Sequence, residues 1–261
     1  MKKNLTAFVL TFVLVSFCAK DVSSQNDCCG VGSLFSYLVR SGISGGYGIQ
    51  QFDAEGLNNY ISVYNQKRVS TLTKKMDDFG LATGFRVGAN LFQVQYDDIL
   101  FGLKLSYQWM KQENEATATI SGATAKREYE LKINTLGVGT SFSYILSKHF
   151  DIKIIDLLLT WTSAKFINRF SEPGKPTTEE TLESPESSIG VIGGTGIVFY
   201  PLPPYVSIEL NIGYSMFSVD EMQFSDGTSL QVNEDTPEIM TNFISAGGFF
   251  AFAQLNLAVP L

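Results

Sequence analysis

The residues that could perform catalysis are few in this chain. Its 261 residues include a single histidine, His149, in the short polar segment Ser147-Lys148-His149. A nucleophile needs a neighbouring base to be activated, and histidine is the usual base. The GxSxG, HExxH and P-loop patterns are absent from the sequence. We therefore predict that the protein is not an enzyme.

Acidic side chains that could hold a metal ion gather in two polar segments. They are Glu179, Glu180, Glu183 and Glu186 in the first segment, and Asp226, Glu234, Asp235 and Glu238 in the second. Carboxylates bind divalent cations, but this spacing matches no calcium-binding loop. We predict solvated acidic loops with no metal and no cofactor. The net charge of −7 and the absence of a basic stripe also exclude a nucleic-acid partner.

Four charged residues stand apart because each lies on the small, polar side of an otherwise alternating stretch: Arg86, Lys104, Asp156 and Glu209. If that side is buried, the charges must be paired. Lys104, Asp156 and Glu209 are expected at similar height, with Arg86 one layer above. This luminal charge network has two interpretations, structural filling of an interior or a switchable gate.

The elements that would position these charges follow a period of two residues. In Phe79–Trp109, the odd positions on both arms are apolar, and the even positions are small or polar. Such alternation predicts two β-strands, each with one apolar face. Since both arms place odd residues on the apolar face, the turn between them needs an odd number of residues. Tyr96-Asp97-Asp98 supplies three.

The same alternation predicts eight strands in all. They cover about residues 42–52, 79–95, 99–119, 127–146, 150–170, 188–200, 206–216 and 249–261. Short turns at Ser147–His149 and Pro201–Pro204 alternate with longer connections. Tyr129, Leu131 and Ile133 have the opposite parity to the apolar residues after them, which predicts a bulge near Thr135. A shift of phase is also expected at Ile154-Ile155.

Three features indicate that the apolar face meets lipid. The opposite face is rich in Gly, Ser and Asn, which suit a narrow lumen, and the strands exceed the usual length. Aromatic residues form two bands, and their separation of roughly 20–25 Å is close to the apolar band of membrane barrels. We predict an all-β protein, an eight-stranded antiparallel up-and-down transmembrane β-barrel.

Three long connections are the expected sites for partners. In Asp53–Asp78, Leu57, Tyr60, Ile61 and Tyr64 recur at helical spacing, with Asp53 placed as the cap, which predicts an amphipathic helix. It is either a packed loop or a lid, plug or docking element. Ser171–Ser187 is expected to be solvated. Phe224–Ile239 is a third polar connection, in which Asp226-Gly227 predicts the tip of a hairpin.

The N-terminus has the pattern of an export signal. Residues 1–24 combine Lys2 and Lys3, an apolar run and a small-residue cleavage site, as in a secretory signal peptide. Gln25–Ser41 is then expected to be a periplasmic leader. It contains Cys28 and Cys29, to which we assign no function. The barrel would occupy residues 42–261.

With its eight strands, alternating short and long connections and final strand FAFAQLNLAVPL, the chain resembles the small OmpA/OmpX-type outer-membrane barrels, especially those of Bacteroidota. The resemblance covers Gly42–Leu261. It departs at Leu261, where such barrels end in an aromatic residue. The resemblance implies a location in the cell outer membrane, among its lipids.

The resemblance leaves several functions open. The first hypothesis is a non-enzymatic barrel that supports the membrane or docks a protein partner through Asp53–Asp78, Ser171–Ser187 and Phe224–Ile239. The second is passage or binding of a small or lipidic ligand, with lateral or luminal space at Gly190–Gly196. The third is a subunit of a larger export or uptake machine.

Overall fold

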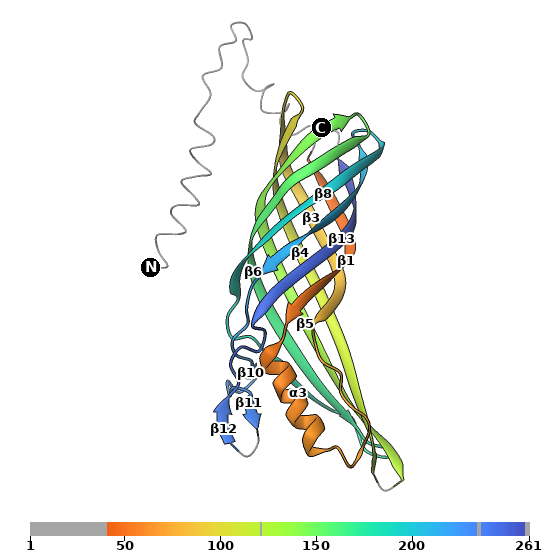
Figure 1. Cartoon of the computed structure of the whole chain (residues 1–261), viewed down its shortest axis with the longest axis vertical. Helices are drawn as coiled ribbons and strands as arrows, with labels where there is room; N and C mark the ends of the chain where they lie inside the picture. The colour runs from red at the N-terminus through yellow and green to blue at the C-terminus, as the bar shows by residue number, and fades with distance from the viewer. Residues whose placement is uncertain (1–40, 121, 234–235, 259–261) are drawn as a thin grey trace, which may run out of the picture. The chain divides into compact units, whose positions relative to one another are not determined.

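Eight long antiparallel strands form a closed sheet (Figure 1). The computed structural model describes residues 41–120, 122–233 and 236–258. The strands are β1 (Gly42–Asp53), β3 (Leu81–Tyr96), β4 (Ile99–Ile120), β5 (Ala123–Ser147), β6 (Phe150–Ser171), β8 (Ser188–Leu202), β9 (Val206–Met216) and β13 (Ala246–Ala258). Each pairs with its neighbours in the chain, and β1 also pairs with β13, which closes the barrel. The predicted fold class is confirmed. The expected signal peptide and the leader through residue 40 lie outside the described residues.

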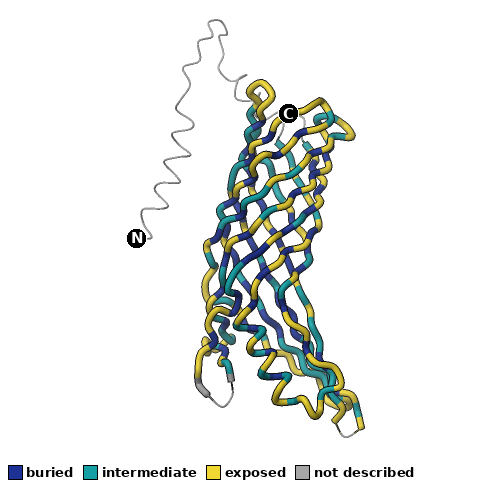
Figure 2. Tube along the Cα trace, viewed as in Figure 1, coloured by how far each residue is buried: buried dark blue, intermediate teal, exposed yellow. Residues whose placement is uncertain are grey.

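Burial alternates along each strand, as the sequence pattern requires (Figure 2). Tyr47 and Phe85 are exposed on the outside of the barrel, whereas Gln50 and Arg86 are buried inside. Successive side chains of a strand point to opposite faces, so an apolar outside and a polar inside follow directly from the alternation. None of the described helices is long and apolar enough to span a bilayer.

The prediction of three-residue turns was wrong. Tyr96 pairs with Ile99, so only Asp97-Asp98 connects β3 to β4. Ser147 likewise pairs with Phe150. The change in parity occurs within the strands instead, at register shifts between Asn90 and Phe92 and between Ile145 and Ser147. A bulge adds one residue to one strand and therefore has the same effect on parity as an extra turn residue.

The predicted bulge at Thr135 is also absent. Thr135 pairs with Gln108 and Thr162 in unbroken register on both sides of β5. Tyr129 and Ile133 therefore share the inner face with Thr135, and both are fully buried. The apolar residues change sides because the interior itself changes, from polar near the short turns to apolar near the long connections. The phase shift predicted near Ile155 is confirmed, since Phe142 pairs with Ile155 and Ser143 with Lys153.

The long connections carry one helix and five short strands. These are α3 (Glu55–Lys67), β2 (Leu72–Lys74), β7 (Thr178–Glu183), β10 (Gln223–Phe224), β11 (Gln231–Asn233) and β12 (Thr236–Ile239). The predicted amphipathic helix is confirmed, with Leu57 and Ile61 fully buried. Asp53 is not its cap, because it still pairs with Ala246 at the end of β1. Gly56 N–H instead donates to the Asn242 carbonyl at 3.0 Å.

The segment 171–187 is not the solvated loop that its composition predicted. Its β7 pairs with β6 on one side and with β10 on the other. Leu182 is buried at 2 % exposure and anchors β7 to the apolar interior. One apolar side chain at the right register, together with ladder hydrogen bonds, is enough to order this polar stretch. The tip at Asp226-Gly227 is confirmed, with Gly227 at φ 84° and Thr228 donating to the Asp226 carboxylate.

Candidate functional site

The four charged residues singled out in the sequence all lie buried inside the barrel. Lys104 Nζ lies 2.6 Å from Asp156 Oδ2. Asp156 also accepts a hydrogen bond from the Asn211 amide at 3.3 Å. Glu209 accepts one from the Asn256 amide at 3.4 Å, but its cationic partner is none of the predicted residues. The pairing is completed by a lysine that the sequence analysis had not assigned.

That lysine is Lys153, which joins the two carboxylates. Its ammonium group lies 3.3 Å from Asp156 Oδ2 and contacts Glu209 Oε1 directly. Lys153 is buried at 4 % exposure. The bulge that follows Lys153 brings it onto the same face as Asp156. The phase shift was visible in the sequence, and applying it to the polar positions as well would have placed Lys153 inside.

Arg86 occupies a separate environment. Its guanidinium donates to Gln108 Oε1 from Nε at 3.2 Å and from Nη2 at 2.9 Å. It also lies over the ring of Phe252, 3.9 Å from the centroid, and near that of Phe250 at 5.2 Å. Amide acceptors and aromatic faces stabilise a buried guanidinium. Arg86 therefore marks the boundary between the polar and the apolar part of the lumen.

The polar part of the lumen is filled by side chains. At the end with the short turns, Lys153, Ser207, Glu209 and Asn256 border a cavity of only about 50 Å³. Such a volume holds a few water molecules. Asp156 Oδ1 and Asn211 Oδ1 are buried without a hydrogen-bond partner among the described residues. This arrangement can fix neighbouring strands to one another.

The other part of the lumen is an apolar cluster closed by α3. Phe166 lies at its centre, with ring centroids 5.0 Å from Tyr129, 5.6 Å from Phe243 and 6.5 Å from Phe79. Leu57 of α3 belongs to the same cluster and is fully buried. The helix therefore acts as a packed plug over the barrel. The apolar cluster was not predicted from the sequence, because the apolar residues in this part of β5 were expected to face lipid.

The Gly-rich stretch Gly190–Gly196 leaves no luminal space. A Cβ at Gly194 would lie 2.8 Å from the Ile212 carbonyl and 3.1 Å from the Phe250 ring. Cβ atoms at Gly190 and Gly196 would overlap the carbonyls of Met216 and Leu210. The glycines are needed because neighbouring backbone approaches closely there. The expected luminal space at these three glycines is therefore filled by the protein itself, whereas a Cβ at Gly193 would have no heavy atom within 4 Å.

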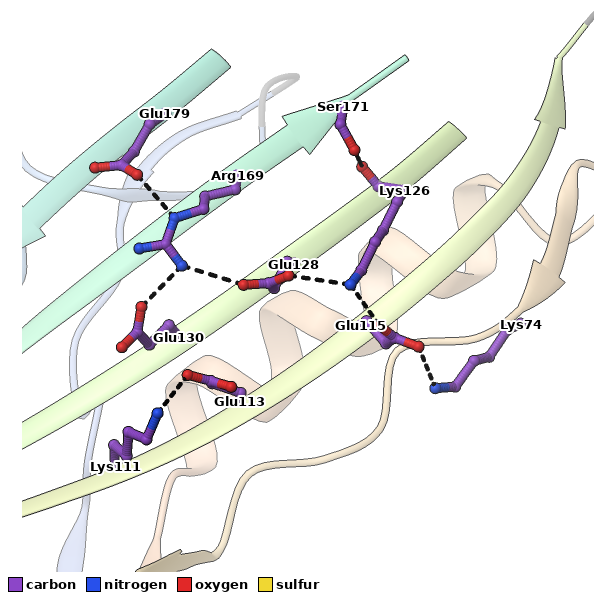
Figure 3. Close-up of polar contacts among 10 residues, drawn as sticks. All are labelled: Lys74, Lys111, Glu113, Glu115, Lys126, Glu128, Glu130, Arg169, Ser171 and Glu179. Atoms are coloured by element: carbon purple, nitrogen blue, oxygen red, sulfur yellow. Dashed lines mark hydrogen bonds and ion pairs between the residues drawn. The ribbon is translucent and has the colours of Figure 1, made fainter. Parts of the chain in front are cut away.

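A second set of charges joins the neighbouring strands β4, β5, β6 and β7 (Figure 3). Arg169 is at its centre, with contacts of 3.1 Å to Glu128, 2.8 Å to Glu130 and 2.7 Å to Glu179. Lys126 continues the ladder, at 2.7 Å from Glu115 and 3.1 Å from Glu128. Exposed pairs are individually weak, but networks of this kind hold strands in register.

Pairing displaces pKa values in this outer network, including those of Arg169 and Glu130. Hydrogen bonds to Glu179 and Glu130 raise the pKa of the Arg169 guanidinium above its ordinary value. Burial raises the pKa of the Glu130 carboxyl, but hydrogen bonds from Lys132 and Arg169 outweigh it and leave the pKa below its ordinary value. Both groups are therefore charged at neutral pH.

The remaining chemical candidates from the sequence have structural contacts. His149 Nδ1 lies 2.8 Å from the Tyr200 carbonyl at the short-turn end of the barrel. Glu179, Glu180 and Glu183 contact Arg169, Asn168 and Lys165 respectively. Within residues 41–120, 122–233 and 236–258, no group of three or more His, Cys, Asp or Glu could hold a metal ion.

Comparisons with known proteins concern the architecture. No protein-family model and no curated protein matches the chain. Among solved structures, Ail, the attachment invasion locus protein of Yersinia pestis, is 15% identical with a TM-score of 0.39, over 83% of this chain and 97% of Ail. Neisserial surface protein A is 11% identical with a TM-score of 0.44, over 84% and 97%. The fold itself, a closed antiparallel β-barrel, is shown by the strand pairing of this chain.

The prediction that the protein is not an enzyme needs correction. The matching structures include the outer membrane protease OmpT of Escherichia coli, at 10% identity and a TM-score of 0.41, over 84% of this chain and 95% of OmpT. A barrel of this general architecture therefore does carry catalysis in another protein. The exclusion drawn from the single histidine and the absent motifs is withdrawn. At this identity the likeness assigns no activity to the present chain.

Proposed function

We propose that the protein is an outer-membrane barrel whose filled lumen is a rigid base for an extracellular docking surface. The observation that carries this proposal is the unequal length of the strands. β4, β5 and β6 have 22, 25 and 22 residues, whereas β9 has 11. Some 10 residues span a bilayer in a tilted strand, so the longer strands continue well beyond it.

The membrane location is supported by the outer face of the barrel. Ile208, Leu210 and Ile212 are 44%, 50% and 59% exposed on β9, and similar apolar side chains surround the wall. A contiguous apolar belt of this extent is unfavourable in water and matches the lipid-facing belt of membrane barrels. The signal-peptide pattern of residues 1–24 supports export, and the resemblance to barrels of Bacteroidota supports a Gram-negative outer membrane.

The proposed docking surface is the part of the protein beyond this belt, which we call the extracellular platform. It comprises residues 54–80, 110–120, 122–133, 162–187, 217–233 and 236–245. Ion pairs such as Arg169–Glu128 join the strands of the platform on the outer face. The inner face of these strands packs on the apolar cluster around Phe166. Val69 and Ile120 are 61% and 41% exposed on it. An ordered surface with exposed apolar side chains among alternating charges suits a protein partner.

Site-specific photo-crosslinking in native outer membranes tests this proposal. We expect a photoreactive residue at Val69 or Thr119, on the platform, to give a discrete crosslinked protein. The matched control at Leu210, on the lipid-facing belt, should give none. A discrete adduct from Leu210 alone would instead support a subunit buried within a larger machine. The absence of adducts from both platform positions would contradict docking.

A further inference from the structure

A row of lysines borders the lipid-facing belt on one side of the barrel. Lys111 of β4 lies directly opposite Lys132 of β5, which lies opposite Lys165 of β6. The next pairs on the same outer face, toward the belt, join Trp109 to Asn134 and Asn134 to Ser163. Because neighbouring strands are about 4.8 Å apart, the three lysines span roughly 10 Å at the polar edge of the belt.

The row is confined to the wall formed by the long strands. On the opposite wall, the outward residues at the corresponding strand ends include Ile189, Met216 and Phe249, which are all exposed and apolar. The basic row is therefore a local feature of one side and not a general charged rim. Side chains of one sign at the polar edge of the belt match the negative charge of lipid headgroups.

An apolar groove on the outer wall lies beside the row. It has a volume of about 890 Å³ and is bordered by Gly45, Tyr47, Phe85, Trp109, Lys111 and Lys132. A Cβ at Gly45 would have no heavy atom within 4 Å, so this glycine leaves the groove open. The groove thus combines an apolar floor with two ammonium groups at its polar end.

Each lysine has a glutamate partner, which for Lys111 and Lys132 lies two residues farther from the belt on the same strand. For Lys165 the partner is the residue directly opposite on β7. Lys111, Lys132 and Lys165 lie 2.8, 3.0 and 2.9 Å from Glu113, Glu130 and Glu183 respectively. These lysine side chains are 57%, 39% and 39% exposed. Exposed ion pairs contribute little, and an ammonium group has three donors, so each lysine can also bind a phosphate. The glutamates then hold the lysines in place beside the belt.

We propose that the Lys111–Lys132–Lys165 row and the adjoining groove bind a phosphate-bearing lipid of the outer leaflet. The lysines bind the phosphates, and an acyl chain lies in the groove past Gly45 and Phe85. This inference rests on the membrane location proposed above, but not on docking of a protein. It assigns a ligand class to the edge of the platform that borders the belt and to the wall beside it.

Native mass spectrometry of lipid retention tests this site. The protein would be placed in nanodiscs of phosphatidylcholine with a minor fraction of bis-phosphorylated lipid A, or of lipid A without phosphates, and then extracted. We expect wild type to retain the phosphorylated form preferentially. Changing Lys111, Lys132 and Lys165 to Gln together should reduce that retention about tenfold. The matched control changes Lys74, Lys126 and Lys175 to Gln, which removes the same charge farther from the belt.

A second pair of variants tests the groove alone. Gly45→Leu should lower retention at least about threefold, because the side chain occupies the acyl site. Gly193→Leu is its control, since Gly193 is also a strand glycine with no heavy atom within 4 Å of an added Cβ. Equal retention by the lysine variant and wild type, or equal loss in either control, would overturn the proposal. Failure of wild type to form a folded, heat-modifiable barrel would instead contradict the membrane location.

Discussion

Replacing Lys153 with methionine is expected to destabilise the barrel by about 3–5 kcal/mol. The substitution keeps the length of the side chain but removes the cation between Asp156 and Glu209. Asp156 retains Lys104, whereas Glu209 loses its cationic partner while it stays buried at 4 % exposure. Urea unfolding in lipid vesicles, followed by tryptophan fluorescence, would measure this loss.

A second substitution separates the missing charge from the missing packing. The double variant Lys153→Met/Glu209→Gln replaces the carboxylate that would otherwise be buried without a cation. More than about half of the lost stability should therefore return. Lys132→Met is the surface control, because that side chain is 39% exposed. A stability of Lys153→Met within about 1 kcal/mol of wild type would show that the network contributes little to the fold.

Truncating Phe166 to alanine is expected to have a comparable effect on the other half of the interior. Phe166 is buried at 2 % exposure among Tyr129, Phe79 and Phe243. Loss of a buried phenylalanine costs about 3–5 kcal/mol, through the lost transfer energy and the cavity that remains. Since α3 packs on this cluster, we also expect trypsin to cleave faster after Lys67 and Arg68, at the end of the helix.

The control for this variant is Phe249→Ala, because Phe249 is 66% exposed on the lipid-facing side. Trypsin applied to intact cells or right-side-out vesicles should cleave Phe166→Ala faster than this control. The barrel strands within the membrane should stay protected in both proteins. Equal cleavage rates would show that α3 is held by contacts other than the apolar cluster.

The strands of the barrel wall could be predicted from the sequence, because the alternation of apolar and polar residues is a local property of each strand. Alternation over Phe79–Trp109 depends only on which side of a strand each residue takes, and a period of two residues determines it. The inward positions of Arg86 and Lys104 followed from the same rule. The turn lengths did not, because a bulge and an extra turn residue change parity equally.

The contents of the barrel were harder to predict because they depend on tertiary contacts. Leu131 and Ile133 are apolar in either environment, so their types alone do not distinguish a lipid-facing side from an interior packed against α3. Leu182 is one apolar residue in a polar segment, and only its register beside Phe166 makes it an anchor. Lys153 was missed for a related reason, since its face depends on the bulge after it.

Single-channel recording in planar lipid bilayers tests most directly whether the barrel is filled. Wild type inserted into the bilayer should give no conductance steps, because side chains occupy the polar half and an apolar cluster under α3 occupies the other half. Lys104→Met should be equally silent, since the apolar cluster remains. Stable, reproducible steps from wild type would contradict the filled barrel, and steps from Lys104→Met alone would show that the luminal charges act as a gate.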